Sequence, residues 1–429
     1  MEIAIRKSVK HKKTIAKEKL PTNTLSSGNR VQRWANFIAG FSIEFVEQCL
    51  KNRNAQKDTV IDPFLGCGTT LIGARNLGFK GVGVESHKLF YNLATAKLKT
   101  YTIENLNYVI KHLNTRTKKV FWSASAETFI SKMFIDSEKE NIRFASFQVE
   151  TLRSDLKPLG IAIFLKACEY TCTAQTDGIY KAPDSKKNSI PFDEALCKVE
   201  EMFLEDIETS WYREHWHLQP NPRLFFHSSE NIKELADNSI DVCITSPPYL
   251  NNFDYAEMTR LQLYLLGWAE SWGDISDKVR NGLITNTTTA LKDKKTENYQ
   301  LLQKNQLPDQ LVVELQEIIE ELSKQRKSRA GKKEYDYLVY PYYGQIYSVI
   351  KELYRCSNTN GEIHWVVADA ALYGVHIKTQ EHTKMLFEAV GFKNVEIIWM
   401  RQRGHRWVLS KRDGAKEALG EYHIKAIKR

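Results

Sequence analysis

The chain has 429 residues, of which 42% are hydrophobic and 26% charged, a composition typical of a globular protein with one large domain and insertions, or with two domains. Its formal net charge of +9 is uneven, because residues 1–30 carry eight Lys/Arg and two Glu, a balance of +6. No apolar run reaches the roughly 18 residues of a membrane helix, and no hydrophobic segment follows the basic start as in a secretory signal. We therefore expect a cytoplasmic protein with no membrane partner.

The seven cysteines are scattered and odd in number, which argues against a disulfide framework. Cys168 and Cys172, with His215 and His217, match no standard zinc spacing, so we expect buried thiols and no metal. The apolar stretch "LGIAIFL" (159–165) is interpreted as a core strand.

The first clear unit along the chain is a βαβ motif, preceded by an amphipathic helix at 41–52. In "DTVIDPFLGCGTTLIGARNLGFKGVGVESHK" (58–88), a strand ends at Asp62, a glycine-rich turn leads into a helix, and a second strand ends at Glu85. Strand-like segments recur from 223, at 241–246, at 361–369 and at 395–403, with helices at 342–356 and 380–392. This alternation predicts an α/β fold with a doubly wound, mostly parallel sheet.

Two segments interrupt the α/β pattern and are interpreted as insertions. Residues 121–221 have weak periodicity, and "WYREHWHLQP" (211–220) is interpreted either as a surface hairpin or as a nucleic-acid contact. Residues 276–334 contain one amphipathic helix and end in the basic cluster "KQRKSRAGKK" (324–333). Basic runs of this kind, like the one at 1–30, suit a polyanion such as nucleic acid, and a solvated surface is the alternative.

The strand ends hold the candidate site, since ligands of open α/β sheets bind beyond the carboxyl ends of the strands. Gly66 and Gly68 allow close approach of a ligand to the backbone. Glu85 follows the turn at about the sequence spacing at which an acidic residue accepts hydrogen bonds from a ribose in nucleotide-binding βαβ units. The turn lacks the lysine of a phosphate-binding loop and the third glycine of a dinucleotide motif, which favours a nucleoside without a pyrophosphate. A tight turn with a core acid is the alternative.

A second motif, "ITSPPY", ends another strand and should face the same crevice. Pro247 and Pro248 carry no N–H and leave carbonyl acceptors, Ser246 adds a hydroxyl, and Tyr249 offers a stacking face. Acceptors beside an aromatic ring suit the exocyclic amine of a flipped nucleobase.

Together, "DPFLGCGTT" and "TSPPY" resemble the S-adenosylmethionine-dependent amino-methyltransferases of DNA, and "TSPPY" is closest to the cytosine-N4 branch, since the adenine-N6 branch more often has Asp or Asn at Ser246. The resemblance covers 31–100 and 222–260 well and 335–407 loosely, and it implies a Rossmann-like sheet with a terminal antiparallel hairpin. The implied catalytic residues are Ser246, Pro247, Pro248 and Tyr249. The implied cofactor contacts are Phe41, Ser42, Asp62, Pro63, Phe64, Gly66, Gly68, Thr69, Glu85 and Ser228.

One departure from the family pattern follows the third strand, where "FFHSS" has Ser228-Ser229 instead of an acid, so either Glu230 substitutes or adenine binding is weaker. A cytosine-C5 enzyme would need a nucleophilic cysteine where this chain has Ser246, so Cys67 and Cys243 are interpreted as packing residues. Arg401, Arg403 and Arg406 in "RQRGHRW" are the candidate phosphate contacts.

The sequence thus predicts a methyltransferase that acts on cytosine N4 in double-stranded DNA. Adenine N6 is the alternative target, and an RNA base methyltransferase or a non-catalytic nucleic-acid-binding protein remain further alternatives. A cognate restriction endonuclease is left open as a partner. The expected organisation is a basic arm (1–30), the cofactor-binding half of the core (31–120), a target-recognition insertion (121–221), the core with TSPPY (222–275), a helical insertion (276–334) and the C-terminal core (335–429).

Overall fold

The computed structural model describes residues 30–35, 40–177, 180–251, 253–328, 333–403, 408–410 and 416–429. Most of the predicted basic arm, four residues of the basic cluster (329–332) and Arg406 therefore lie outside the described residues.

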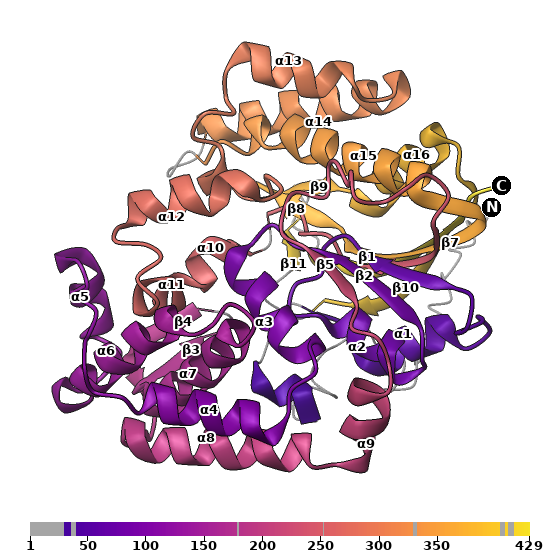
Figure 1. The fold of residues 1–429 in the computed structure, drawn as a ribbon. Coiled ribbons are helices and arrows are strands. Elements are labelled where there is room, and N and C mark those ends of the chain that lie inside the picture. Colours follow the sequence, from indigo (N-terminus) through magenta and orange to yellow (C-terminus); the bar gives the residue numbers. More distant parts are fainter. Residues whose placement is uncertain are drawn as a thin grey trace, which may run out of the picture.

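A seven-stranded sheet forms the centre of the molecule, with the strand order β10-β13-β7-β6-β1-β2-β5 (Figure 1). Neighbouring strands from β7 to β5 pair in parallel, whereas β13 is antiparallel to both β7 and β10. The parallel part has the doubly wound order 3-2-1-4-5, so the predicted fold class is confirmed. The strands are β1 (Thr59–Asp62), β2 (Lys80–Val84), β5 (Arg223–Phe225), β6 (Ile240–Thr245), β7 (Ser357–Ala368), β10 (Lys393–Gln402) and β13 (Gly420–Ile427).

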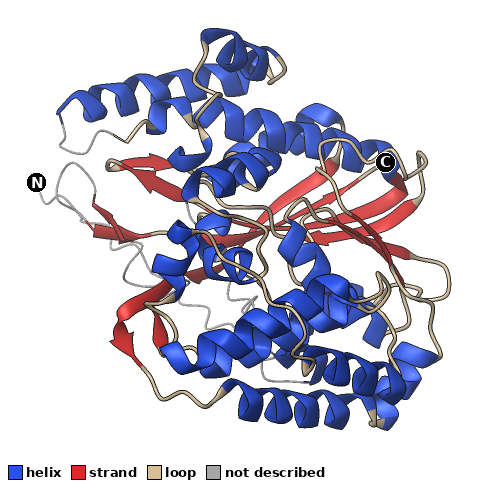
Figure 2. Cartoon of the chain, turned by 60° about the vertical axis from the view of Figure 1, so that its left-hand side comes forward, coloured by secondary structure: helices blue, strands red, loops and turns tan. Residues whose placement is uncertain are grey.

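Helices cover both faces of this sheet. Side chains alternate between the two faces along each strand, so neighbouring strand residues pack against different helices. On β1, Val60 packs with Phe45 and Val46 of α1 (Ile43–Leu50), whereas Ile61 packs with the cluster formed by α15 (Val339–Cys356) and α16 (Thr379–Val390). Figure 2 shows the sheet as a middle layer with helices above and below it. Both faces of the central strands are thus apolar core.

The βαβ motif forms as predicted. Helix α2 (Thr69–Asn76) begins after Gly68 and is followed by Gly78, whose φ of +83° is the left-handed stop expected there. Two further helices, α3 (Lys88–Leu98) and α4 (Ile103–Leu113), follow β2.

Residues 121–221 fold as a helical unit beside the sheet, seen around α4 and α8 in Figure 1. "LGIAIFL" is a helix and not a strand, because it lies in α7, which is apolar on all sides and buried among its neighbours. "WYREHWHLQP" is not a surface hairpin either: it forms a short helix and a π-helical turn (Arg213–His217) whose Tyr212 and Trp216 are fully buried. Cys168 and Cys172 are buried free thiols, as predicted. The elements of this unit are α5 (Ala124–Ile130), α6 (Asp136–Thr151), α7 (Lys157–Thr171), β3 (Ala174–Asp177), β4 (Tyr180–Lys186), α8 (Phe192–Ile207) and α9 (Ser210–Tyr212).

The 276–334 segment is helical and packs on the α15–α16 side of the sheet. Its long helix α14 buries Leu311, Leu315 and Leu322, the apolar face predicted from the sequence. The remaining elements are α10 (Tyr255–Met258), α11 (Arg260–Leu265), α12 (Trp272–Lys278), α13 (Glu297–Asn305), α14 (Asp309–Ser328), β8 (Ala370–Leu372), β9 (Val375–Ile377), β11 (Val408–Ser410), β12 (Lys416–Ala418) and 3₁₀ turns at Arg30–Trp34, Arg280–Gly282, Thr288–Ala290 and Tyr335–Tyr337. Within the described ranges, no helix is long and apolar enough to span a membrane.

Candidate active site

The site lies at the edge of the sheet where the parallel strands end. Asp62 is the last residue of β1, Glu85 follows β2, and Ser246 follows β6. Because β13 runs in the opposite direction, its first residues reach the same edge, and Glu421 pairs with Ala368 at the end of β7. We call this the catalytic edge.

Asp62 ties three elements together through its buried carboxylate. Its Oδ1 accepts hydrogen bonds from Thr245 Oγ1 of β6 (2.6 Å) and Phe64 N (3.0 Å), and its Oδ2 accepts from Thr70 Oγ1 of α2 (2.5 Å). Burial raises the pKa of Asp62 to about 6, and these hydrogen bonds oppose the rise. Asp62 therefore holds the glycine-rich turn against β6, and through β6 it is linked to the TSPPY motif.

The turn itself needs glycine at two positions. Gly66 has φ +52° and Gly68 has φ +90°, both in the left-handed region. A Cβ at Gly68 would also lie 3.1 Å from Leu98 Cδ1. The backbone at the catalytic edge is therefore free of side chains at these two residues, as a closely bound nucleoside requires.

Glu85 closes the other side of the turn. Its Oε2 accepts from Gly66 N (2.8 Å) and its Oε1 from His87 N (2.7 Å). Burial raises the pKa of Glu85 to about 7 although these N–H groups favour the charged form. Each carboxylate oxygen has a second lone pair, so Glu85 can also accept hydrogen bonds from the two hydroxyls of a ribose.

The other predicted cofactor contacts flank this turn. Phe41 and Ser42 are buried at the start of α1, where Ser42 Oγ accepts from Phe45 N (3.2 Å), and α1 packs against α2. Thr69 accepts a hydrogen bond from Gln32 Nε2 (3.2 Å), and the ring of Phe64 meets Trp365 edge-on at 5.9 Å.

The residues after β5 also reach the turn, through Ser229 and not through Ser228. Ser229 Oγ donates to the carbonyl of Pro63, whereas Ser228 Oγ donates to Glu230 Oε1 (3.2 Å). Glu230 in turn accepts from Gln345 Nε2 of α15 (3.0 Å). An acid is therefore present two residues after the position where the family usually has one, and it is held by α15.

The TSPPY turn begins a chain of hydrogen bonds that the sequence did not reveal. Ser246 Oγ donates to Tyr249 Oη (3.2 Å), Tyr249 Oη donates to Glu421 Oε1 (3.0 Å), and Arg401 Nε donates to Glu421 Oε2 (2.6 Å). Glu421 is 5% exposed. We call this set of four side chains the Ser246–Arg401 chain, and it connects the predicted catalytic hydroxyl to a buried carboxylate.

Tyr249 is held in place from several sides. Asn286 Nδ2 donates to the Tyr249 carbonyl (3.2 Å), so the 276–334 segment supports the turn. The guanidinium of Arg403 lies 5.7 Å from the centre of the Tyr249 ring. Burial, with the nearby Glu421 carboxylate, keeps the pKa of Tyr249 well above its usual value, so the phenol stays protonated and can donate.

Glu421 and Asn286 are thus functional candidates that sequence reasoning missed. Glu421 lies 172 residues from Tyr249 in the chain. The one available signal was an acid inside the apolar pattern of the last strand. Of the three predicted phosphate contacts, Arg401 and Arg403 lie at the catalytic edge beside Glu421 and Tyr249, and Arg406 lies outside the described residues.

The fold and the site have the features expected of one class of protein: an α/β enzyme with a nucleoside pocket at β1 and β2 and with acceptor atoms and an aromatic ring at β6. A family model described as DNA methylase matches residues 2–96. Over 96% of its length the chain is 23% identical to the type II methyltransferase M.BsoBI of Geobacillus stearothermophilus, 86% of which is covered. Over 87% of its length it is 24% identical to the type II methyltransferase M.AvaI of a Nostoc species, 81% of which is covered.

A solved structure of a SAM-dependent methyltransferase from Methanosarcina mazei matches 89% of the chain and is itself covered to 96%, with 9% identity and a TM-score of 0.29. The family model and the two relatives support the family of DNA amino-methyltransferases, which the two motifs of the site also resemble. Its cofactor is accordingly S-adenosylmethionine. The residues at β1 and β2 fit this cofactor, because they offer a bare glycine turn and ribose acceptors and, from 62 to 70, no cation for a phosphate.

Proposed function

We propose that the chain methylates the N4 amine of cytosine within a specific sequence of double-stranded DNA, as a type II modification enzyme. The observation that carries the choice of base is Ser246 at the head of the TSPPY turn, where the resemblance associates Ser with cytosine N4 and Asp or Asn with adenine N6. Adenine N6 is the alternative target.

The turn supplies the acceptors that an amine needs. The Ser246 hydroxyl donates to Tyr249 and so keeps its lone pairs for one of the two N4 protons. The Pro247 carbonyl is the second acceptor, and among the described residues it accepts none of the backbone hydrogen bonds of turns and loops. Accepting both protons directs the nitrogen lone pair out of the base plane, which turns a poor nucleophile into a positioned one. The bound cofactor supplies the electrophilic methyl group.

The surplus proton needs an exit after the amine is methylated, and the Ser246–Arg401 chain offers one. The proton on the methylated nitrogen passes to Ser246 Oγ, the Ser246 proton to Tyr249 Oη, and the Tyr249 proton to Glu421, so that each hydroxyl ends neutral. The donor directions of the two hydrogen bonds from Ser246 and Tyr249 already match this order. Arg401 balances the charge of Glu421 before the transfer.

Other parts of the proposal concern DNA and the cell. We assign target recognition to the 121–221 unit, and phosphate contacts to Arg401, Arg403, Arg406 and the basic arm. The catalytic core then comprises 31–120, 222–275 and 335–429. The enzyme would work in the cytoplasm on nucleoid DNA, with a cognate restriction endonuclease as its genetic partner.

The direct test is product analysis. Unmethylated genomic DNA is incubated with the protein and S-adenosylmethionine, digested to nucleosides and compared with standards by mass spectrometry. N4-methyldeoxycytidine supports the proposal, N6-methyldeoxyadenosine overturns the choice of base, and an absence of methylated deoxynucleosides overturns the activity. Ser246→Ala should lower turnover at least 100-fold with unchanged cofactor affinity, whereas Ser239→Ala, at the opposite end of β6, should behave as the unmodified protein.

A further inference from the structure

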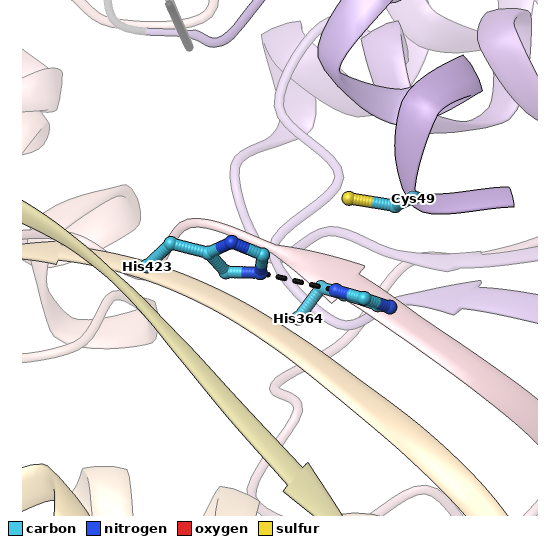
Figure 3. A group of neighbouring side chains, drawn as sticks. All are labelled: Cys49, His364 and His423. Carbon is cyan, nitrogen blue, oxygen red and sulfur yellow. Dashed lines mark hydrogen bonds between the residues drawn. The ribbon is translucent and has the colours of Figure 1, made fainter. Parts of the chain in front are cut away.

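Three side chains of metal-binding type converge away from the catalytic edge. Cys49 of α1, His364 of β7 and His423 of β13 each offer one ligand atom, and these atoms lie within 4.8 Å of one another (Figure 3). Both histidines are buried and Cys49 is partly buried. We call this group the Cys49 cluster.

Strand register explains why the two histidines meet. On the antiparallel pair β7–β13, His423 pairs with Val366 and His364 pairs with Lys425, so the two imidazoles are diagonal neighbours on one face of the sheet. Helix α1 covers that face and contributes Cys49. Beside the cluster, Phe45 of α1 and Val366 of β7 belong to one apolar core. Two adjacent imidazoles are unusual contents for such a core.

The distances suit a cation at the centre. His364 Nδ1 and His423 Nε2 are 3.0 Å apart and share one proton (Figure 3). Tetrahedral zinc with Zn–N bonds of about 2.0–2.1 Å separates two such nitrogens by about 3.3 Å, so the ion fits with shifts of a few tenths of an ångström. A Zn–S bond of about 2.3 Å requires Cys49 Sγ to approach the nitrogens by up to about 1 Å.

The surroundings of His364 supply the outer support of a metal ligand. Its second nitrogen, Nε2, lies 3.6 Å from Glu362 Oε2 and has no hydrogen-bond partner among the described residues. Glu362 is held by Arg53 Nη1 at 3.1 Å. A carboxylate behind the far nitrogen fixes the proton there and leaves Nδ1 as the ligand, as in carboxylate–histidine–zinc sites.

We propose that the Cys49 cluster is a structural site for Zn²⁺ or a similar divalent cation, with water as the fourth ligand. Binding replaces the proton shared by the two imidazoles, which moves to His423 Nδ1, and releases the Cys49 thiol proton, so one proton leaves per ion. The ion links α1 to β7 and β13. It thereby fixes the helix that directly follows Phe41 and Ser42.

The test uses Co²⁺ as a spectroscopic probe on the metal-free, full-length protein. We expect visible tetrahedral bands and an ultraviolet thiolate-to-cobalt band at one ion per chain, both removed by Zn²⁺. Cys49→Ser should abolish the ultraviolet band and weaken Co²⁺ binding at least tenfold, while Cys197→Ser, at an exposed thiol, should leave both unchanged.

A second variant separates coordination from a folding defect. Glu362 supports His364 and is not itself a ligand. Glu362→Gln should therefore weaken Co²⁺ binding 10- to 100-fold, and saturating Co²⁺ should restore the ultraviolet band. The absence of a thiolate band in the unmodified protein, or its persistence in Cys49→Ser, would show that the two histidines serve only as a hydrogen-bonded pair in the core.

Discussion

The affinity for S-adenosylmethionine should depend on pH through Glu85. Burial raises the pKa of this carboxyl to about 7, while the N–H groups of Gly66 and His87 oppose the rise. A ribose donates to the ionised form, so binding requires loss of the Glu85 proton. With a pKa near 7 the ionised fraction is about one in eleven at pH 6 and about ten in eleven at pH 8, and the dissociation constant should therefore fall about tenfold between these values.

Calorimetry at pH 6, 7 and 8 in buffers of different ionisation enthalpy measures both the affinity and the proton count. Near pH 7 about half a proton should leave per cofactor bound. Glu85→Gln should bind more weakly and lose this step, whereas Glu388→Gln on the exposed side of α16 should keep it. A flat profile in the unmodified protein, or the same tenfold step in Glu85→Gln, would refute the role of this carboxylate.

The same group should affect the stability of the cofactor-free protein. Its folded pKa lies above the ordinary value of 4.5, so the folded state holds a proton that the unfolded state has lost between pH 4.5 and 7. The free energy of unfolding therefore falls as the pH rises through this window, by up to about 3 kcal/mol. Thermal unfolding with and without cofactor should show a gap that widens from pH 6 to 8.

Three further variants test other parts of the site. Glu421→Gln should lower kcat about 100-fold or more, the usual contribution of a proton acceptor, with cofactor affinity unchanged. Glu396→Gln, at an exposed position of β10, should leave kcat as it is. An unchanged kcat in Glu421→Gln would remove Glu421 from the proton route. Gly68→Val should abolish cofactor binding, because φ is +90° and the added Cβ meets Leu98, and normal affinity by calorimetry would move the cofactor away from this turn. Deleting residues 1–29 should weaken DNA binding and flatten its salt dependence, and an unchanged slope would exclude the arm from the DNA interface.

The parts of the fold that were predictable from sequence are those specified by local chemistry. The βαβ unit has its own stop signals, such as Gly78, and the α14 face repeats with helical spacing, so both were located correctly. Segment 159–165 was misassigned because a short apolar run fits a buried strand and a buried helix equally well. In 211–220, the rings of Tyr212 and Trp216 were taken for surface groups, but they are fully buried.

The candidate site likewise has residues that could be predicted from sequence and residues that could not. Asp62 ends a strand and Glu85 and Ser246 directly follow strands, so all three could be placed at one edge from the direction of parallel strands alone. The partners of Asp62 could not, since Thr70 and Thr245 are donors that only the packed structure identifies. The Cys49 cluster was equally hidden, because Cys49 is more than 300 residues from the two histidines, which are themselves 59 residues apart, and the three follow no metal-binding spacing.

Strand direction accounts for the position of Glu421. A parallel strand in the place of β13 would put its first residues at the opposite edge of the sheet, about 25 Å from Tyr249 for eight residues at about 3.3 Å each. Because β13 is antiparallel to β7 and β10, its first residues instead reach the catalytic edge. There Glu421 accepts a hydrogen bond from Tyr249 and pairs with Arg401 at the end of β10. The antiparallel strand thus brings to the site a residue that no rule about carboxyl ends of parallel strands could identify, and the carboxylate it delivers is the one that the proton route requires.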